Sequence, residues 1–474
     1  MAGLVAVTST DAPATARPAG TGRSRLVAAA VVGLVTTAVY TVFSVRQWAR
    51  FEVPSWDLGI FTQVLRQYAE LNAPVVSIKG EGFMILGDHF HPLLVLLAPV
   101  YALFPSGLTL LVMQNVLIGV SAVIVTACAA RHLGTVAGIL LGLAYGLSWG
   151  LQSAVASQFH EIALAVPLLA ACCAALVRRD HRAAALWAAP LVLVKEDLGI
   201  TVAAVGLVLV IRGSRRLGAG LIVGGVAAFL ITTRLILPAL NPDGVWDYAD
   251  DSILSLLTTD PGGAVNVLLA GAGEKALLVL AVFAITGFLA LRSPIALLTL
   301  PTFAWRLSSD VPFHWDLHWH YSAVLMPVVF LAAVDALRLL PALRRWARWV
   351  TAGLLAISLA VSTNFPLADL VEPRTYAPSV HDGGARAALA MVPDDAVVAT
   401  DITLLAYLAP RAQVYWVGNE GNPVPDFVVV NRNSGVYGDD PPEDVVAYAE
   451  EKFPAAEFTQ VLDEQGFAVA ERTG

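Results

Sequence analysis

The sequence predicts an α-helical polytopic membrane protein with about eleven transmembrane helices and a small C-terminal extracytoplasmic α/β domain. Of its 474 residues, 57% are hydrophobic and only 14% are charged, whereas soluble domains carry about a quarter charged residues. Its mean hydropathy is +0.69. Arginine clusters also fall at alternate ends of the apolar segments, as the positive-inside rule requires of a multi-pass chain.

The charge and the cysteines exclude other classes of protein. The formal net charge of −8 argues against a nucleic acid partner, because nucleic-acid-binding proteins carry basic patches. The three cysteines stand inside apolar segments, where they behave as small hydrophobic residues. We therefore expect no disulfide framework.

The predicted organisation has three parts. Residues 1–25 are rich in small residues, Thr and Pro, and are interpreted as a disordered cytoplasmic tail. The apolar run after Arg25 is long and lacks a cleavage site, so it is predicted to be an uncleaved first span and not a signal peptide. The transmembrane domain is then 26–363, with an outer loop at 45–106, and the extracytoplasmic domain is 364–474.

Roughly 20 apolar residues are needed for a helix to cross the membrane. Full-length candidates are 26–44, 107–130, 133–150, 160–177, 217–240, 275–291, 320–340 and 348–363, and shorter ones are 183–194, 198–211 and 294–306. The basic ends, predicted to be cytoplasmic, carry Arg23, Arg25, Arg131, Arg178, Arg179, Arg182, Arg212, Arg215, Arg216, Arg292, Arg344, Arg345 and Arg348. The N-terminus is thus predicted to be cytoplasmic and the C-terminal domain extracytoplasmic.

Three segments depart from simple spans. Residues 91–104 are apolar but too short to cross, so we predict a juxtamembrane or half-inserted helix. Residues 183–211 hold two short apolar halves around "KED" (195–197) and predict a hairpin of short helices with its tip below the outer surface. Residues 241–274 predict an outer loop with a surface helix.

After residue 363 the sequence becomes rich in Asp, Glu and Pro. The stretch 381–418 predicts helix, strand, helix and strand in that order, and "DFVVVN" predicts a further strand. This pattern is typical of a small α/β domain.

Ionisable groups at membrane depth are costly and tend to mark function. Here they gather on the predicted outer side. Six of the nine histidines stand in outer motifs, namely His89, His91, His160, His314, His318 and His320. The outer side is therefore where we expect the functional site.

Asp57 opens "WDLGIFTQVLRQYAE" (56–70), a helix-like run close behind the first span. One interpretation is a helix N-cap, because an aspartate there accepts backbone N–H bonds and complements the helix dipole. The functional interpretation is a general base, or a metal-binding carboxylate, facing a cavity at the membrane edge. The two are compatible, since capping would fix the direction of the carboxylate.

Asp88, His89 and His91 stand together in "GDHFHP" (87–92). The HxH spacing can place both rings on one divalent metal ion, with Mg, Mn or Zn as candidates. The alternatives are polar anchoring at the interface and phosphate binding by His91.

His160 and Glu161 stand at the outer start of a span in "QFHEIAL" (158–164). They either cap that helix, or Glu161 supplies the second carboxylate of an acid/base or metal pair with Asp57.

Lys195, Glu196 and Asp197 form the tip of the predicted hairpin, where three charges are costly unless paired. One interpretation is that Lys195 pairs with Glu196, Asp197 or Asp57. The other is that Lys195 neutralises a substrate phosphate while the acids orient it.

The stretch "HWDLHWHYSAVLMP" (314–327) mixes tryptophans and histidines just before a span. An interfacial aromatic belt is the plain interpretation. Its polar groups exceed what a belt requires, so His320 and Tyr321 remain candidates for the site.

Taken in order, these motifs resemble the GT-C superfamily of integral-membrane glycosyltransferases, such as protein O-mannosyltransferases and aminoarabinose transferases. The matching features are an early outer-loop aspartate, an apolar outer stretch, a span with a basic end, a hairpin tip and a late span start. Here they are Asp57, 91–94, 131–134, Lys195 and 320–321. The sequence differs where Leu58 follows the aspartate and where His320 replaces the arginine before the tyrosine.

More closely, "SWDLGIFTQ", "GDHFHPLL", "QFHE" and "KED" resemble the domain-of-unknown-function 2079 (DUF2079) family of membrane proteins, over about residues 26–430. The superfamily implies an inverting transfer of a sugar from a polyprenyl-phosphate donor to an extracytoplasmic glycan, lipid or protein acceptor. Asp57 would be its general base, with Glu161 beside it. The residues expected to bind substrate are His91, Lys195, Glu196, Asp197, His320 and Tyr321, and those expected to bind metal or orient the acceptor are Asp88, His89, His160 and Glu161.

Two other functions fit parts of the sequence. A transporter or flippase also has broken helices and intramembrane charges, but its charges lie near the midplane, and this sequence shows no internal repeat. The other is a non-enzymatic envelope-assembly protein or receptor whose outer domain does the work. An outer cavity with Asp57, Lys195 and His320 within reach favours transfer chemistry, and a midplane cavity open to both sides would contradict it.

Overall fold

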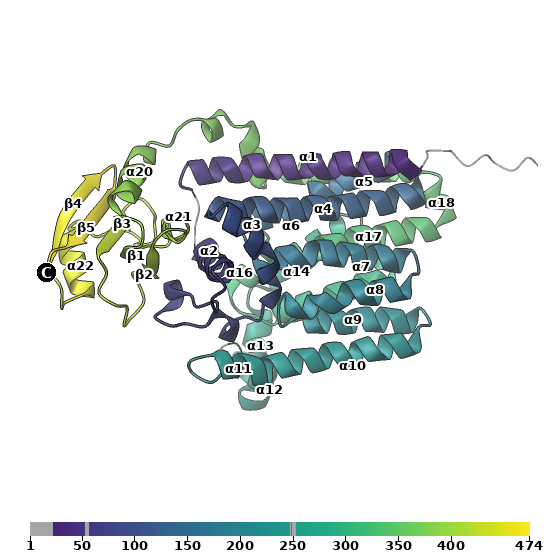
Figure 1. The fold of residues 1–474 in the computed structure, drawn as a ribbon. Helices are drawn as coiled ribbons and strands as arrows, with labels where there is room; N and C mark the ends of the chain where they lie inside the picture. The colour runs from purple at the N-terminus through teal and green to yellow at the C-terminus, as the bar shows by residue number, and fades with distance from the viewer. Residues whose placement is uncertain (1–21, 53–55, 247, 249–252) are drawn as a thin grey trace, which may run out of the picture.

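The structure is a computed structural model that describes residues 22–52, 56–246, 248 and 253–474. Its long helices run side by side as a bundle, and a small sheet lies beyond the end opposite to the start of α1 (Figure 1). The helices up to residue 240 are α1 (Gly22–Ala49), α2 (Trp56–Ala69), α3 (Ala98–Leu103), α4 (Gly107–Leu133), α5 (Thr135–Gly146), α6 (Trp149–Ala156), α7 (Ala165–Val177), α8 (His181–Ala188), α9 (Leu198–Ile211), α10 (Arg215–Ile231) and α11 (Leu237–Leu240).

The later helices complete the bundle and enter the C-terminal region. They are α12 (Ile253–Thr259), α13 (Pro261–Leu269), α14 (Ala272–Ala284), α15 (Leu300–Leu307), α16 (Pro312–Trp315), α17 (Leu325–Leu339), α18 (Pro341–Arg344), α19 (Ala347–Ser362), α20 (Asp382–Met391), α21 (Leu405–Leu408) and α22 (Val445–Lys452). The short 3-10 helices are η1 (Ser77–Lys79), η2 (Ile85–Gly87), η3 (Pro92–Leu97), η4 (Glu161–Leu164), η5 (Ala189–Leu193), η7 (Leu289–Arg292), η8 (Pro294–Thr299), η9 (His320–Ser322), η10 (Pro366–Val371) and η11 (Pro373–Tyr376), and η6 (Thr232–Ile236) is a π-helix.

The bundle has a buried centre and an apolar outside. Helix α4 packs against α1, α5, α7 and α17, and α17 is buried all the way from Leu325 to Leu337. The outward faces of α1 and α10 expose large apolar side chains such as Leu34 and Val223, each 69% exposed. Such a surface is unfavourable in water and suits contact with lipid.

Among the described residues, four helices are long and apolar enough to cross a membrane, or up to six if each of two bent pairs counts as one span. The four are 22–49, 107–133, 135–156 and 215–240, and further apolar helices are only 10–17 residues long. The total of about eleven crossings therefore stays a prediction. Residues 1–21 of the predicted tail lie outside the described residues, and α1 begins at Gly22, before the expected start at 26.

Three predicted spans are not continuous helices in the structure. In 320–340, η9 is separated from α17, and the chain bends there by 67°. The segment 275–291 stops at Ala284 because Gly287 (φ 55) and Phe288 (φ 59) adopt left-handed backbone conformations that end the helix. The segment 294–306 is not one helix, because η8 is followed by α15, which begins with Pro301 in its first turn.

The other irregular segments match their predictions in outline. Residues 92–103 are helical, as η3 followed by α3. Helices α8 and α9 form the expected short hairpin, with 195–197 between η5 and α9. The surface helix expected in 241–274 corresponds to α12 and α13.

The C-terminal region forms a five-stranded sheet with strand order β2-β1-β3-β5-β4. Its strands are β1 (Val397–Thr400), β2 (Gln413–Trp416), β3 (Phe427–Asn431), β4 (Phe458–Glu464) and β5 (Phe467–Arg472). Strand β1 pairs in parallel with β2 and β3, and β5 pairs antiparallel with β3 and β4. The predicted helix, strand, helix and strand are α20, β1, α21 and β2, whereas the β4–β5 hairpin was not predicted.

This C-terminal unit packs directly on α2. A Cβ atom added to Gly59 would lie 2.8 Å from Cβ of Leu405, so α2 and α21 are in close contact there. The side-chain amide of Gln63 donates to the carbonyl oxygen of Val414 (2.9 Å) and to Oγ of Ser77 (2.9 Å). The sheet and the loop that follows α2 therefore fix the helix that carries Asp57.

Candidate active site

Side chains from four distant segments meet at the end of the bundle that faces the C-terminal unit. Asp57 lies in the first turn of α2, where a carboxylate complements the helix dipole. His160 and Glu161 lie at the start of η4, Lys195 lies between η5 and α9, and His320 begins η9. The structure thus brings together residues that lie between positions 57 and 320 of the sequence.

Asp57 is held by a histidine. Its Oδ2 lies 3.4 Å from Nε2 of His160, and 43% of the Asp57 side chain is exposed against 5% of His160. Nδ1 of His160 lies 3.1 Å from the carbonyl oxygen of Gln158. Because both ring nitrogens face oxygen acceptors, this environment favours the doubly protonated imidazolium ring.

The charge on Asp57 follows from these neighbours. Burial alone would raise the pKa of Asp57, but the nearby charge of His160 lowers it, and Lys195 lowers it further. The net effect is a pKa below the usual value of 3.8. Asp57 is therefore an ionised, partly accessible carboxylate at neutral pH.

The ring of His320 stacks on the ring of His160. Its ring centroid lies 3.5 Å from that of His160, at an interplanar angle of 22°. Nδ1 of His320 is buried without a hydrogen-bond partner among the described residues, as are both polar atoms of the Gln158 side chain. Buried polar atoms without partners are rare in proteins, so these atoms are available to a polar ligand.

Lys195 pairs with Glu161. The distance from Nζ to Oε1 is 2.8 Å, and the side chains are 19% and 3% exposed. Burial would lower the pKa of Lys195, but Glu161, Glu196 and Asp197 raise it well above its usual value. Lys195 is thus a cation. Its ion-pair partner among the described residues is Glu161, whereas the sequence had suggested Glu196, Asp197 or Asp57.

Glu196 pairs with His89. Oε1 of Glu196 lies 2.8 Å from Nδ1 of His89, and Oε2 accepts the backbone N–H of Phe90 at 3.0 Å. Burial raises the pKa of Glu196, but His89 outweighs it and the value falls to about 2. The ring of His89 also stacks on Tyr248, with centroids 5.0 Å apart.

Asp197 and His91 have no ion-pair partner among the described residues. Asp197 is half-buried and His91 is buried. Oδ1 of Asp197 is buried without a partner among the described residues, and burial followed by the charges of Glu196 and Glu161 raises its pKa to about 6. His91 is 1% exposed, and burial lowers its pKa to about 4. His91 is therefore neutral at neutral pH and can offer a hydrogen bond, not a positive charge.

The expected metal ligands have separate partners. Oδ2 of Asp88 binds Nζ of Lys79 at 2.7 Å, while His89 faces Glu196 and His160 faces Asp57. Across the residues that the structure describes, no group of three or more His, Cys, Asp or Glu side chains is arranged to hold a metal ion. This donor set does not fit a shared ion, and the mechanism below uses none.

Arg306 is a further residue of the site that is absent from the predictions above. It is fully buried, and its guanidinium donates to the carbonyl oxygens of His314 and Asp316 and to Oγ of Ser322 (2.9 Å). These bonds fix the loop that leads into η9. The signal in the sequence is an arginine at the outer end of the predicted span 294–306, on the side where basic residues are unusual.

The remaining predicted residues lie around Arg306 or outside the site. Tyr321 packs edge-on against Trp305 and His314, with Arg306 5.7 Å from its ring centroid. His318 is 63% exposed and pairs with Asp316.

Comparisons with known proteins place the chain in a family. A family described as predicted membrane protein (DUF2079) matches residues 48–452. The crystal structure of ArnT from Cupriavidus metallidurans bound to undecaprenyl phosphate is similar, with 15% identity, a TM-score of 0.54, and coverage of 95% of this chain and 98% of that chain. The apo state of ArnT gives 13% identity, a TM-score of 0.51 and coverage of 93% and 97%.

At this level of identity the likeness concerns the fold. The bundle and the C-terminal sheet together have the ArnT-like GT-C fold. Comparison with curated proteins finds no match. The match over residues 48–452 is decisive, and the chain belongs to the DUF2079 family of predicted membrane proteins.

Proposed function

We propose that the protein is an integral-membrane glycosyltransferase that moves a sugar from a polyprenyl-phosphate donor to an extracytoplasmic acceptor. The observation that carries the proposal is the ionised, partly accessible carboxylate of Asp57, held by His160 close to the cation of Lys195. The ArnT structure with a similar fold is bound to undecaprenyl phosphate, which is itself a polyprenyl phosphate. The proposed orientation has the N-terminus in the cytoplasm and the C-terminal unit outside.

Asp57 acts as the general base. It takes the proton of the acceptor hydroxyl while the acceptor oxygen attacks the anomeric carbon of the donor. The bond between that carbon and the phosphate oxygen breaks at the same time, and its electron pair leaves on the polyprenyl phosphate. Attack from the face opposite to the leaving group inverts the configuration of the sugar.

Lys195 stabilises the departing phosphate. An ammonium group has three N–H donors, and Oε1 of Glu161 takes up one of these directions at 2.8 Å. A phosphate that approaches Lys195 adds a second acceptor, and the positive charge offsets the charge that develops on it. Glu161 keeps Lys195 in place and prevents an isolated buried cation.

His160 and His320 position the base. The imidazolium of His160 fixes the carboxylate of Asp57 and keeps it ionised, and the stacked ring of His320 fixes His160. The unpartnered Nδ1 of His320 is a donor or acceptor for the sugar or its phosphate. Glu196 and Asp197 belong to the same charged set and orient the donor from the hairpin tip.

The envelope glycans of the host test this function. In a strain that lacks the gene, we expect one sugar substituent to disappear from an envelope glycan, lipid or protein, and its polyprenyl-phosphate-linked form to accumulate. Complementation with the wild-type chain restores the substituent, whereas the Asp57→Asn variant does not. Unchanged glycans, with no accumulated donor, would contradict the proposal.

A further inference from the structure

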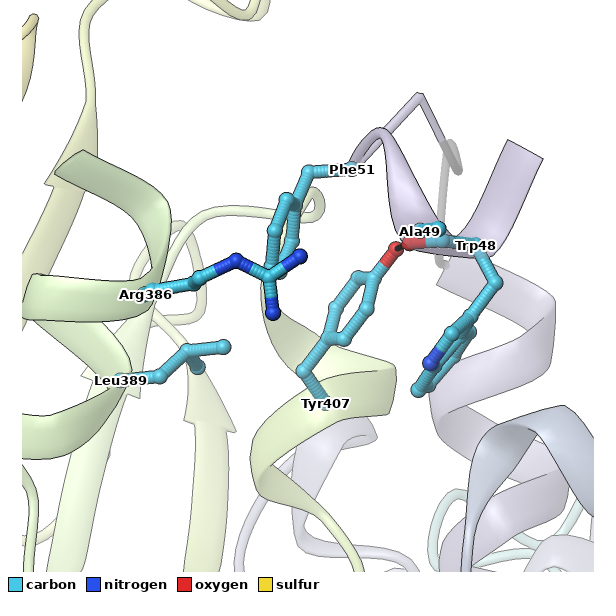
Figure 2. A pocket seen from close by; sticks show the side chains of 6 residues that line it. All are labelled: Trp48, Ala49, Phe51, Arg386, Leu389 and Tyr407. Atoms are coloured by element: carbon cyan, nitrogen blue, oxygen red, sulfur yellow. Dashed lines mark hydrogen bonds between the residues drawn. The ribbon is translucent and has the colours of Figure 1, made fainter. Parts of the chain in front are cut away.

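A hollow lies between the outer end of α1 and the C-terminal unit (Figure 2). Its volume is about 400 Å³, within the range of roughly 300–1,000 Å³ that small-molecule sites occupy. The residues that line it are Trp48, Ala49, Phe51, Arg386, Leu389 and Tyr407. None of them belongs to the charged cluster around Asp57.

Aromatic rings fix the shape of the hollow. The rings of Trp48 and Tyr407 are stacked with centroids 3.9 Å apart, and Phe51 lies 4.9 Å from Tyr407. The hydroxyl of Tyr407 donates to the carbonyl oxygen of Trp48 at 2.9 Å, as Figure 2 also shows. The walls from α1 and α21 are thus tied to each other.

Arg386 supplies the charge of the hollow. Its guanidinium carbon lies 5.4 Å from the ring centroid of Phe51, and Figure 2 shows it pointing between Phe51 and Leu389 toward Tyr407. Within the described part of the chain, Arg386 forms no ion pair. The other arginines after residue 363 all do, namely Arg374, Arg411, Arg432 and Arg472.

We propose that this hollow binds an anionic sugar unit, a pyranose that carries a carboxylate. The apolar faces of the rings suit the C–H face of a pyranose, and a planar guanidinium matches a carboxylate with two parallel hydrogen bonds. The guanidinium of Arg386 lies over the ring of Phe51, and its planar fork loses less freedom for each hydrogen bond formed than a lysine would.

The hollow lies on the acceptor side of the proposed reaction. Tyr407 belongs to α21, and the same short helix contacts Gly59 of α2 through Leu405. A ligand in the hollow is therefore one helix away from the helix that carries Asp57. The assignment of this sugar as part of the acceptor rests on the proposed function, whereas its binding does not.

Calorimetric titration of the full chain in lipid nanodiscs tests the binding. The probes are a glucuronic-acid-containing disaccharide and a neutral disaccharide of the same size. We expect the acidic probe to bind, the neutral probe to bind at least tenfold more weakly, and Arg386→Gln to weaken the acidic probe at least tenfold. Leu389→Trp, which fills the hollow and keeps Arg386, abolishes binding of both probes.

Lys452→Gln is the matched control, because it removes one positive charge from the same unit at a residue that does not line the hollow. It should bind the acidic probe as the wild type does. Equal affinity in wild type, Arg386→Gln and Leu389→Trp would overturn the proposal. So would an absence of disaccharide binding combined with Arg386-dependent association with phosphatidylglycerol vesicles, since the hollow would then be a lipid headgroup site.

The two proposals fail in different ways. If both hold, Asp57→Asn binds the acidic probe with wild-type affinity and transfers no sugar. If Asp57→Asn transfers sugar normally while Arg386→Gln still loses the probe, only the proposed role of Asp57 is wrong.

Discussion

Nε2 of His160 lies 3.4 Å from Oδ2 of Asp57, and the other nitrogen of the ring faces the carbonyl oxygen of Gln158. The pair joins the start of α2 to the start of η4. It turns a carboxylate whose pKa burial would raise into one whose pKa lies below its usual value. The proposed role of Asp57 as a general base depends on this relationship.

Replacement of His160 should shift the pH dependence of transfer. In His160→Ala the positive charge is lost while the desolvation of Asp57 remains, so the pKa of Asp57 rises. A general base must be deprotonated, and its activity falls as the pH falls through its pKa. We expect the acid limb of the rate profile to lie at higher pH in the variant than in the wild type.

Transfer rates measured between pH 3 and pH 8 check this shift. The control is His318→Ala, which removes an exposed histidine that pairs with Asp316 and not with Asp57. Superimposable acid limbs for His160→Ala and the wild type would show that His160 does not act on the base.

The charges of Lys195 and Glu161 should depend on each other for stability, whereas sugar transfer should require Lys195 itself. Lys195→Met leaves the buried Glu161 carboxylate without its ion-pair partner, which costs roughly 3–5 kcal/mol of the free energy of unfolding. The double variant Lys195→Met/Glu161→Gln removes both charges and should recover most of that stability. It should not recover transfer, because the charge for the leaving phosphate is absent.

Thermal unfolding in detergent and the KM for the polyprenyl-phosphate donor distinguish the two effects. Recovery of both stability and transfer in the double variant would mean that Lys195 has only a structural role.

Asp197 should destabilise the protein at neutral pH. Its pKa is raised from 3.8 to about 6, so the folded state binds more protons than the unfolded state between these values. The free energy of unfolding therefore falls as the pH rises from about 4 to about 6. Asp197→Asn should raise the unfolding temperature at pH 7.5, by a free energy on the order of 1 kcal/mol.

The gain from Asp197→Asn should shrink as the pH is lowered through that window. Glu81→Gln serves as control, since Glu81 is exposed in the loop after α2 and should give no gain at any pH. A stabilisation by Asp197→Asn that is equal at pH 4 and pH 7.5 would contradict the assigned pKa.

Gly59 should be needed for docking of the C-terminal unit. A Cβ atom there would lie 2.8 Å from Cβ of Leu405 and 3.1 Å from Cδ1 of Ile78, and overpacking of this kind costs about 1–3 kcal/mol. Gly59→Ala should lower the unfolding temperature and speed proteolytic release of the C-terminal unit. Gly353→Ala in α19, where no atom of the described residues lies within 4 Å of the added atom, should be neutral or slightly stabilising.

The helices of the bundle could be predicted because their signal is local. A continuous apolar run such as 107–130 predicts a helix from composition alone. The observed helix α4 begins at the same residue and ends only three residues later, at Leu133. The strand pair β4–β5 could not be predicted in the same way. Strand β4 lies at the edge of the sheet and is largely exposed, so its sequence lacks the apolar alternation of a half-buried strand.

The members of the site could be predicted better than their partners. Unusual charges at one end of the bundle identify Asp57, His160 and Lys195, because such groups are rare near a membrane. The pairing of these residues depends on how η4 and the tip between α8 and α9 pack against each other. No sequence pattern predicts that packing. The Lys195–Glu161 pair emerges only from that packing. The buried Arg306 could have been noticed in the sequence as an arginine at the outer end of a predicted span, but its partners could not.

The most direct test of the account is sugar transfer by purified Asp57→Asn. A radiolabelled polyprenyl-phosphate sugar and envelope extract serve as substrates, and Glu52→Gln, an exposed residue close in sequence, is the control. Because general base catalysis contributes about 10²–10⁴-fold, we expect the transfer rate of Asp57→Asn to fall by at least a hundredfold, with unchanged membrane insertion. Undiminished transfer by Asp57→Asn would contradict the account.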